Sequence, residues 1–336
     1  RIEVPEKLRE MEATSEMCKL VHMYYFGHVV NAGKGSPSGG IYFDFSRFTD
    51  EQIDEMFEAV MDHFDGFYKH GYYHGESIID FRDLAKKKRR VEVGLTSEYS
   101  VGGIFVDENM FTGVPGLYAA GEAASGVFGA NRVADAVTEM LVQGYKAGEV
   151  AAARASEQTR VASDDAAIER AVGVLEKLLS NQGGIAVSEA IDRLGEISDN
   201  ALGMVRNETT LRAGVEAFET LGAEMDGISL RGKSLRYNRE LMQALAARNL
   251  LACSRVAAKM ALERRESRGL HLRDDYSYID NENWQVRQLA ELVNGEDKLS
   301  KKVPVVTRIP LRKAEKIDYE SFILEEDLGM KNMEES

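Results

Sequence analysis

Residues 98–132, EYSVGGIFVDENMFTGVPGLYAAGEAASGVFGANR, carry the clearest indication of fold class in this chain. Within them, residues 117–120 form a short apolar run that ends at Gly121-Glu122. Such a run is typical of a buried strand whose end lets a ligand approach the backbone closely. Gly129-Ala130-Asn131-Arg132 follows, just before a helix-forming stretch. This order predicts an arginine near the strand ends, where α/β folds bind ligands.

Helical periodicity dominates the chain beyond this stretch. Apolar residues recur at helical spacing from residue 134 to about 154, which predicts a helix packed on the sheet. Residues 155–165 are polar and indicate a linker. An antiparallel helical bundle is then predicted from amphipathic segments joined by short loops, at residues 167–179, 188–202, 209–221 and 240–265.

The N-terminal part of the chain has elements of its own. Residues 41–45 are rich in strand formers, and Thr49 or Asp50 is expected to cap a helix over 51–69. The basic run 86–90 is interpreted as a solvated connector before a strand at 91–93, in preference to a nucleic-acid or targeting patch.

Composition excludes several classes of protein. The 336 residues are 44% hydrophobic and 29% charged, which indicates a globular chain with more than one domain. The net charge of −14 argues against nucleic-acid binding, because phosphates would be repelled. There is no apolar run of about 18 residues, so no membrane-spanning helix is expected. Cys18 and Cys253 are too few for a cysteine-ligated cluster or zinc site, and they fit a reducing compartment.

The motifs closely resemble those of the fumarate reductase/succinate dehydrogenase flavoprotein family, over essentially the whole chain. The matching pieces occur in the family's order, at residues 40–44, 102–103, 121–122, 129–132, 263–275 and 280–284. The resemblance implies FAD as the cofactor and hydride transfer between FAD and a carboxylate-bearing substrate like fumarate or succinate. It also implies a partner iron–sulfur subunit that takes up the electrons. The expected location is cytoplasmic, either free or peripheral to a membrane complex without inserting into it.

The fold implied by the resemblance is α/β plus α. Residues 1–96 would be the remainder of a capping domain and its connection, and 97–154 the closing part of a Rossmann-like FAD-binding domain. Residues 155–296 would form the helical bundle domain and 297–336 an extended C-terminal tail. The family's dinucleotide fingerprint, Gly-x-Gly-x-x-Gly, has no match in the chain. The chain is therefore expected to be a C-terminal portion that needs an upstream half of the flavoprotein, and to be inactive in isolation.

The resemblance also implies roles for individual residues. Arg132 matches the arginine that grips a substrate carboxylate, for which a guanidinium is well suited. The alternative is an arginine paired with an acid such as Asp135 or Glu139. Glu122 would bond the flavin or its ribityl chain, against the alternative of a surface glutamate. Gly102-Gly103 would let the isoalloxazine ring lie close to the backbone.

Two positions depart from the family pattern. Glu98 stands where the family usually places a substrate-binding histidine before Tyr99. A carboxylate there would repel a dicarboxylate and would suit a cationic, amino or hydroxyl group, so Glu98 is expected to reshape specificity. The family's Asn-Ser-Leu near the flavin pyrimidine is replaced by residues 136–138. Val137 and Thr138 are then expected to contribute backbone donors to the flavin.

Other interpretations remain open. The chain could be a non-catalytic interaction module of an electron-transfer complex, because it is acidic and lacks the usual histidine. It could also belong to an amino-acid oxidase of the L-aspartate type, which shares the sequence of residues 266–271. His271 and Trp284 are expected to be structural. His70 and His74 are not expected to bind a metal, since Gly71 and Gly75 disfavour a helix there.

Overall fold

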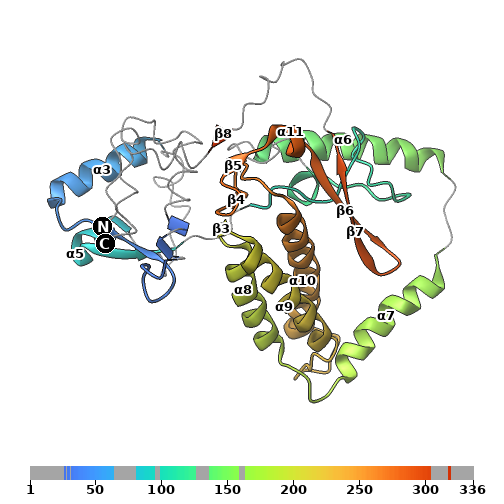
Figure 1. Cartoon of the computed structure of the whole chain (residues 1–336). Helices are drawn as coiled ribbons and strands as arrows, with labels where there is room; N and C mark the ends of the chain where they lie inside the picture. Colours follow the sequence, from blue (N-terminus) through green and yellow to red (C-terminus); the bar gives the residue numbers. More distant parts are fainter. Residues whose placement is uncertain are drawn as a thin grey trace. The chain divides into compact units, whose positions relative to one another are not determined.

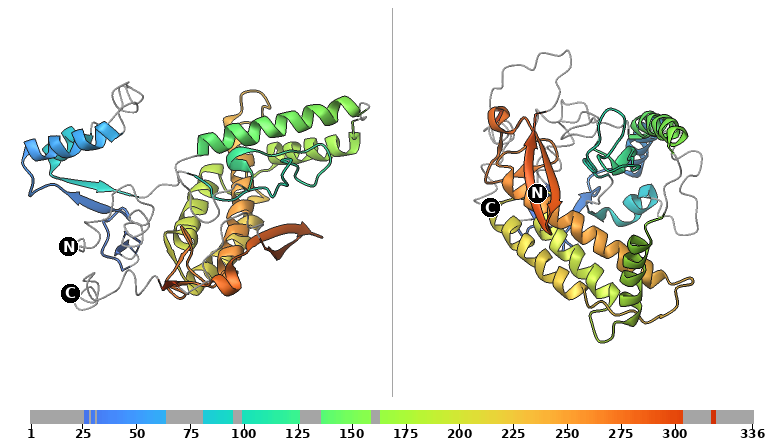
Figure 2. Two further views of the ribbon diagram at one scale, coloured as in Figure 1. Left: turned by 90° about the horizontal axis from the view of Figure 1, so that it is seen from above. Right: turned by 90° about the vertical axis from the view of Figure 1, so that its right-hand side faces the viewer.

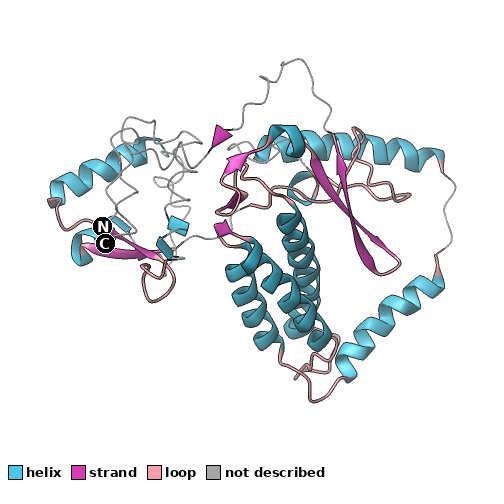
Figure 3. Ribbon diagram, viewed as in Figure 1, coloured by secondary structure: helices cyan, strands magenta, loops and turns pink. Residues whose placement is uncertain are grey.

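The computed structural model describes residues 26–27, 29–30, 32–63, 81–94, 99–125, 136–158, 163–303 and 317–318. The chain divides into two compact units. Tyr25–Glu98 forms the smaller one, and Tyr99–Ser336 with Arg1–Tyr24 forms the larger. Figures 1 and 3 show the elements of each. The predicted division into four domains is not tested by this partition and stays a prediction.

The smaller unit is a two-stranded ribbon covered by helices. Strand β1 (Ile41–Asp44) pairs antiparallel with β2 (Arg90–Val93), with Ile41 opposite Val93. Helices α3 (Asp50–His63) and α5 (Phe81–Lys88) contact each other, and α5 contacts β2. A small core holds the unit together, formed by Phe45, Ile53, Ala85 and Val91.

Helix α3 begins as the sequence predicts. The backbone N–H of Gln52 donates to Oγ1 of Thr49 at 3.3 Å, and the Gln52 side chain accepts from the Thr49 N–H at 3.0 Å. This reciprocal pair satisfies N–H groups that a helix leaves unbonded at its start. The predicted end at residue 69 lies outside the described residues.

The basic run is a connector only at Arg89, which links α5 to the predicted strand; its lysines belong to the helix and Arg90 begins β2, so the interpretation of the whole run as a connector is wrong. Its lysines form the last turn of α5, where cations complement the helix dipole. Lys86 pairs with Asp54 of α3 at 2.5 Å. Arg89 donates to the carbonyl of Phe48 at 2.9 Å. The run therefore fastens α5 to α3.

The segment 99–125 of the larger unit is largely irregular, although the sequence predicts strands there. It contains two isolated β-bridges, Ile104 with Ala124 and Phe111 with Tyr118. A turn lies at residues 107–109, where Oδ1 of Asp107 accepts from the backbone N–H groups of Asn109 and Phe111. The predicted regular strands are wrong for this segment, because its described residues pair only through these single bridges. A strand needs a neighbour along its length.

Helices occur where periodicity predicts them. The helix expected from residue 134 is α6 (Ala136–Glu157). The four later segments are α7 (Asp165–Ser180), α8 (Val187–Leu202), α9 (Glu208–Met225) and α10 (Arg239–Glu263). Helices α8, α9 and α10 contact one another and lie side by side in both views of Figure 2. The predicted bundle is confirmed for these helices, while α7 contributes its last turns through Leu175, Leu178 and Leu179.

The bundle has a continuous apolar core. Phe218, Leu221 and Ile228 are fully buried in it, together with Leu194 of α8 and Ala244 of α10. Burial of a large apolar side chain contributes roughly 1.5–3 kcal/mol relative to an exposed one. Asn207 caps α9 and Asn238 caps α10, each accepting from a backbone N–H in the first turn.

Short strands and a hairpin follow the bundle. Strand β3 (Val205–Arg206) pairs in parallel with β4 (Leu272–Arg273), and β5 (Tyr278–Ile279) pairs with β8 (Ile317–Asp318). A short helix, α11 (Asn281–Trp284), separates β5 from the hairpin of β6 (Arg287–Val293) and β7 (Glu296–Lys302).

Sequence analysis missed the hairpin although its turn was readable. The turn is Asn294-Gly295, with φ of 54° and 84°. This dipeptide between two strand-forming runs is the strongest short-range hairpin signal. The boundary predicted between residues 296 and 297 falls inside β7. Of the predicted extended tail, residues 304–316 and 319–336 lie outside the described residues.

Candidate flavin-facing site

The Gly121-Glu122 motif forms a short 3-10 turn, η1 (Gly121–Ala123). Oε1 of Glu122 accepts from the backbone N–H of Ser100 at 2.7 Å. The N–H of Ile104 donates to the Ala123 carbonyl at 2.9 Å. These contacts join the segment that contains Gly102-Gly103 to the Gly121-Glu122 turn. The Glu122 side chain is nevertheless exposed, so its carboxylate can also reach a ligand.

Gly102 and Gly103 differ in what surrounds them. A Cβ on Gly103 would lie 2.6 Å from the Ala123 carbonyl oxygen, so glycine is required there by the chain's own backbone. A Cβ on Gly102 would meet nothing within 4 Å, and its φ of +121° lies where other residues are strained. The backbone of Gly102 is therefore the one that a planar ligand can approach.

Buried polar side chains of α6 fix the η1 turn. The N–H of Gly121 donates to Oε1 of Gln143 at 2.7 Å, and Nε2 of Gln143 donates to Glu139 at 2.9 Å. Both side chains are buried. Sequence analysis missed Gln143. The available signal was a polar pair at i and i+4, which shares one face of a helix.

The apolar stripe of α6 is exposed. Val137, Leu141 and Tyr145 expose 63%, 69% and 76% of their surfaces. The prediction that this stripe packs on a sheet is wrong for the residues that the structure describes. The physical reason is that the buried face of α6 is the polar one that holds η1, and the strands expected beneath the stripe do not form.

Several predicted site residues come together here. Glu122, Gly102 and Gly103 meet at η1, and α6, which carries Val137 and Thr138 in its first turn, packs on η1. Arg132 and Glu98 lie outside the described residues, so their roles stay predictions. Glu139, weighed above as a partner for Arg132, accepts a hydrogen bond from Gln143.

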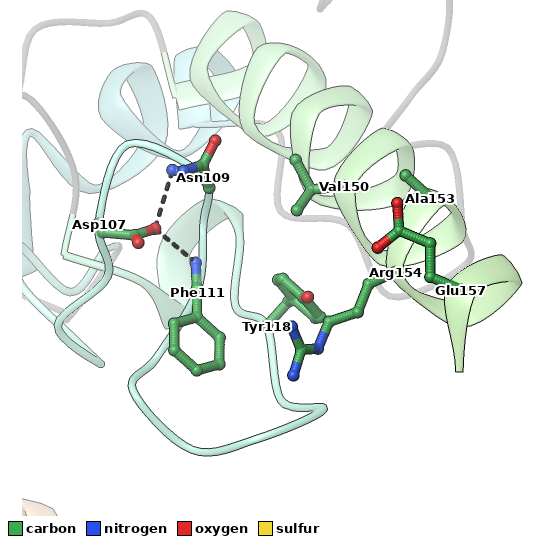
Figure 4. Close-up of a pocket in the computed structure, with 8 residues that line it drawn as sticks. All are labelled: Asp107, Asn109, Phe111, Tyr118, Val150, Ala153, Arg154 and Glu157. Atoms are coloured by element: carbon green, nitrogen blue, oxygen red, sulfur yellow. Dashed lines mark hydrogen bonds between the residues drawn. The ribbon is translucent and has the colours of Figure 1, made fainter. Parts of the chain in front are cut away.

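A hollow of about 300 Å³ lies toward the other end of α6 (Figure 4). Phe111 and Tyr118, whose ring centroids are 5.8 Å apart, lie on the loop side. Val150 and Arg154 line the side formed by α6. The hollow is separate from η1, because Gln143, which holds η1, lies about two turns nearer the start of the helix. We therefore do not assign it to the flavin.

A second polar cluster lies between the end of α10 and α11. Glu266 is fully buried and bonds to Arg264 at 2.5 Å and to Arg268 at 2.8 Å. Arg273 is also buried and bonds to Asp275. Arg264 stacks over the ring of Trp284, with 5.2 Å between guanidinium carbon and ring centroid, and Trp284 is buried. Trp284 is thus a packing residue, as predicted.

His271 is held neutral within this cluster. Its Nδ1 lies 3.2 Å from Nη1 of Arg206 and its Nε2 lies 3.3 Å from the carbonyl oxygen of Arg264. Because a guanidinium only donates and a carbonyl only accepts, Nε2 carries the proton. Burial and the Arg206 charge lower the His271 pKa to about 3. Burial, with the Arg273 charge, lowers the pKa of Arg206 to about 10. The structural role predicted for His271 agrees with these contacts.

The described residues also bear on metal binding and on membrane insertion. Within those ranges, no cluster of three or more His, Cys, Asp or Glu side chains is arranged to hold a metal ion. His70 and His74 lie outside them. In the same part of the chain, no helix combines the length and apolar character needed to cross a bilayer.

Two models of known protein families match separate regions of this chain. Residues 24–135 match the family model described as "FAD binding domain". Residues 191–319 match the one described as "Fumarate reductase flavoprotein C-term", which spans the bundle from α8, the polar cluster and the hairpin.

Individual proteins agree with these matches. The fumarate reductase flavoprotein subunit of Haemophilus influenzae is 34% identical over 57% of this chain and 33% of its own length. A subunit of the CoM/CoB fumarate reductase of Methanothermobacter marburgensis is 29% identical over 73% of this chain and 42% of its own length. Mycobacterium smegmatis Sdh1, solved in complex with UQ1, superposes with a TM-score of 0.74 at 27% identity, over 93% of this chain and 50% of that one.

The chain belongs to the fumarate reductase/succinate dehydrogenase flavoprotein family, whose cofactor is FAD. It spans between a third and a half of the length of the relatives named above.

Proposed function

We propose that this chain is the C-terminal portion of a flavoprotein oxidoreductase subunit. The complete protein transfers hydride between FAD and a carboxylate-bearing substrate like fumarate or succinate. Electrons pass to an iron–sulfur partner subunit. The observation that carries the proposal is the η1 turn, which holds an exposed Glu122 beside the open backbone of Gly102.

The residues around η1 suit the flavin end of FAD. Gly102 offers backbone that a planar ring can lie against. Glu122 offers a carboxylate that can accept from the hydroxyls of a ribityl chain. Val137 and Thr138 lie in the first turn of α6, where backbone N–H groups lack partners within the helix and favour ligand oxygens. FAD, when bound, supplies the redox chemistry by accepting or donating the hydride.

The protein side chains then bind and orient the substrate. Arg132 holds a substrate carboxylate through a bidentate contact, which fixes the orientation of the reacting carbons. Glu98, in the position of the usual histidine, repels a second carboxylate and favours a substrate with an amino or hydroxyl group nearby. These two assignments rest on the family motif and predict a substrate range shifted from fumarate itself.

The exposed stripe of α6 supports the same proposal. Val137, Leu141 and Tyr145 would be covered by the part of the FAD-binding domain that this chain does not contain. Contiguous apolar side chains in water are costly, and such patches usually mark contact surfaces.

Flavin binding tests the proposal at η1. FAD is titrated into the purified chain and into the complete flavoprotein, and quenching of flavin fluorescence is followed. We expect tight, stoichiometric binding only in the complete protein, and about tenfold weaker binding after Glu122→Ala. Glu108→Ala, an exposed acid on the same segment, is the matched control. Equal affinity of both variants would remove Glu122 from the site.

Turnover of the complete protein tests the substrate class. Oxidation of reduced viologen is followed with fumarate, and reduction of a dye is followed with succinate and with L-aspartate. We expect Arg132→Gln to abolish turnover of a carboxylate substrate and Arg132→Lys to retain a small part of it. Unchanged turnover with impaired assembly would favour the non-catalytic module. Turnover of L-aspartate alone would favour the amino-acid oxidase.

A further inference from the structure

Helix α10 has an uncharged face toward solvent. Every exposed residue of this helix from 242 to 257 lacks a charge, and we call this set the α10 face: Met242, Gln243, Ala246, Asn249, Leu250, Ala252, Cys253 and Ala257. Met242 and Leu250 expose 65% and 55% of their surfaces. Solvent-facing helix sides usually carry charged residues, so this face is unusual.

Helix α9 of the same bundle shows the ordinary pattern. Its exposed side includes Arg212, Glu216 and Glu219. Between residues 242 and 257, the cations of α10 are directed to neighbouring carboxylates, since Arg248 pairs with Asp226 at 3.4 Å and Arg255 pairs with Asp297 at 3.1 Å. The α10 face is therefore left with small and apolar side chains and two uncharged amides, Gln243 and Asn249, and its three alanines would let another helix approach closely.

The basic loop, residues 231–239, leads directly into this face. It carries Arg231, Lys233, Arg236 and Arg239 and no acid, in a chain of net charge −14. Within it, Leu235 is 65% exposed and Tyr237 is fully exposed. Tyr237 has a φ of 53°, a left-handed conformation that costs free energy for a bulky residue.

The basic loop is held in shape by the bundle. The side-chain amide of Asn238 donates to the carbonyls of Gly232 and Ser234 at 2.8 and 2.9 Å. Glu240 accepts from the N–H of Arg231 at 2.8 Å. Nζ of Lys233 donates to the Asn181 carbonyl at 2.8 Å. The loop is thus preorganised to present Tyr237, and preorganised aromatic and arginine residues dominate binding energy at interfaces.

We propose that the basic loop and the α10 face together form the docking surface for a separate protein that presents an apolar helix flanked by carboxylates. The apolar helix lies along the α10 face, and its carboxylates meet Arg236 and Arg239. An acidic partner is repelled by most of this acidic chain and attracted at the basic loop, which fixes its orientation. This surface needs none of the residues proposed to hold the flavin.

Cross-linking in the producing cells identifies the occupant. The photoreactive residue p-benzoyl-L-phenylalanine is placed at position 237 or 250 of the full chain, and cross-linked peptides are sequenced by mass spectrometry. We expect both positions to reach one separate protein, through a helical segment with flanking Asp or Glu. Cross-links only to a second copy, only to the rest of the same flavoprotein, or to nothing would overturn the proposal.

The second experiment measures the affinity of the purified partner for the chain and its variants. Ala246→Glu on the α10 face should weaken binding at least tenfold. The double variant Arg236→Glu, Arg239→Glu should weaken it as much, and its affinity should depend less on salt concentration than that of the unaltered chain. Ala213→Glu on the exposed side of α9 is the matched control and should change nothing. Equal affinity of all variants would overturn the proposal. So would binding of the chain to phosphatidylglycerol vesicles that the same substitutions abolish, because the occupant would then be a lipid surface.

Discussion

The helical bundle and the segment around α6 use their side chains in opposite ways. In the bundle, apolar residues such as Phe218 and Leu194 are buried and ion pairs such as Arg193 with Glu224 are exposed. In α6, Glu139 and Gln143 are buried while Leu141 and Tyr145 face solvent. The bundle therefore carries its own apolar core, whereas the described residues of α6 bury a polar face and expose an apolar one. Apolar spacing along a helix therefore does not by itself determine which of its faces is buried.

The largest effect is expected at the buried carboxylate that anchors the polar cluster to the bundle. Glu266→Gln removes a fully buried carboxylate and leaves the partly buried guanidinium groups of Arg264 and Arg268 without their counter-charge, which should cost about 3 kcal/mol of unfolding free energy. Urea unfolding followed by circular dichroism measures this. Glu224→Gln breaks an exposed pair and should lower the free energy of unfolding far less than Glu266→Gln, because solvent screens the two charges. Similar losses in both variants would show that the cluster is not a buried network.

Matched leucine substitutions test the comparison itself. Leu194→Ala in the bundle should cost about 2–5 kcal/mol, because it removes buried contacts and leaves a cavity. Leu141→Ala in α6 should change the free energy of unfolding by no more than about 0.5 kcal/mol, since that side chain is 69% exposed. The same urea experiment serves for both. A large loss at Leu141 would mean that α6 is covered in solution, for instance by a second copy.

Acid should destabilise the bundle end through His271. Its pKa is about 3 in the folded chain, below its ordinary 6.5, because burial and Arg206 disfavour the charged ring. Between about pH 6.5 and 3, His271 is therefore protonated in the unfolded chain and neutral in the folded chain. The contribution of neutral His271 to the free energy of unfolding is complete above about pH 6.5 and is lost as the pH falls toward 3. The free energy of unfolding should fall by about 2 kcal/mol between pH 7.5 and 5. His271→Asn should remove this part of the slope in urea titrations at each pH; an unchanged slope would assign it elsewhere.

The smallest expected effect concerns the polar contact between α6 and η1. Gln143→Leu leaves the Gly121 N–H without its acceptor, which should cost about 1–3 kcal/mol locally. We expect faster amide hydrogen exchange at Gly121 and weaker flavin binding in the complete protein. Gln243→Leu, on the exposed side of α10, is the control and should leave exchange at Gly121 unchanged.

Local signals predicted much of this molecule. The Thr49 cap and the four helices after residue 163 follow from capping chemistry and from apolar spacing within one element. The Asn294-Gly295 turn is an equally local signal. Without it, the extended tail was predicted to begin at residue 297, inside the second strand of the hairpin. The predicted strands failed for another reason, because pairing depends on neighbours distant in the chain.

The amino-acid sequence alone specified the family, its cofactor and the helices, because motif order and periodicity are properties of neighbouring residues. Tertiary structure decided which side of each helix is buried and what each glycine is for. Gly103 is required by the Ala123 carbonyl, while Gly102 is open to a ligand, although the two are adjacent. It also decided that His271 is neutral and that the exposed residues of α10 between 242 and 257 carry no charge. These properties depend on desolvation and on distances between residues far apart in the chain, which no local pattern encodes.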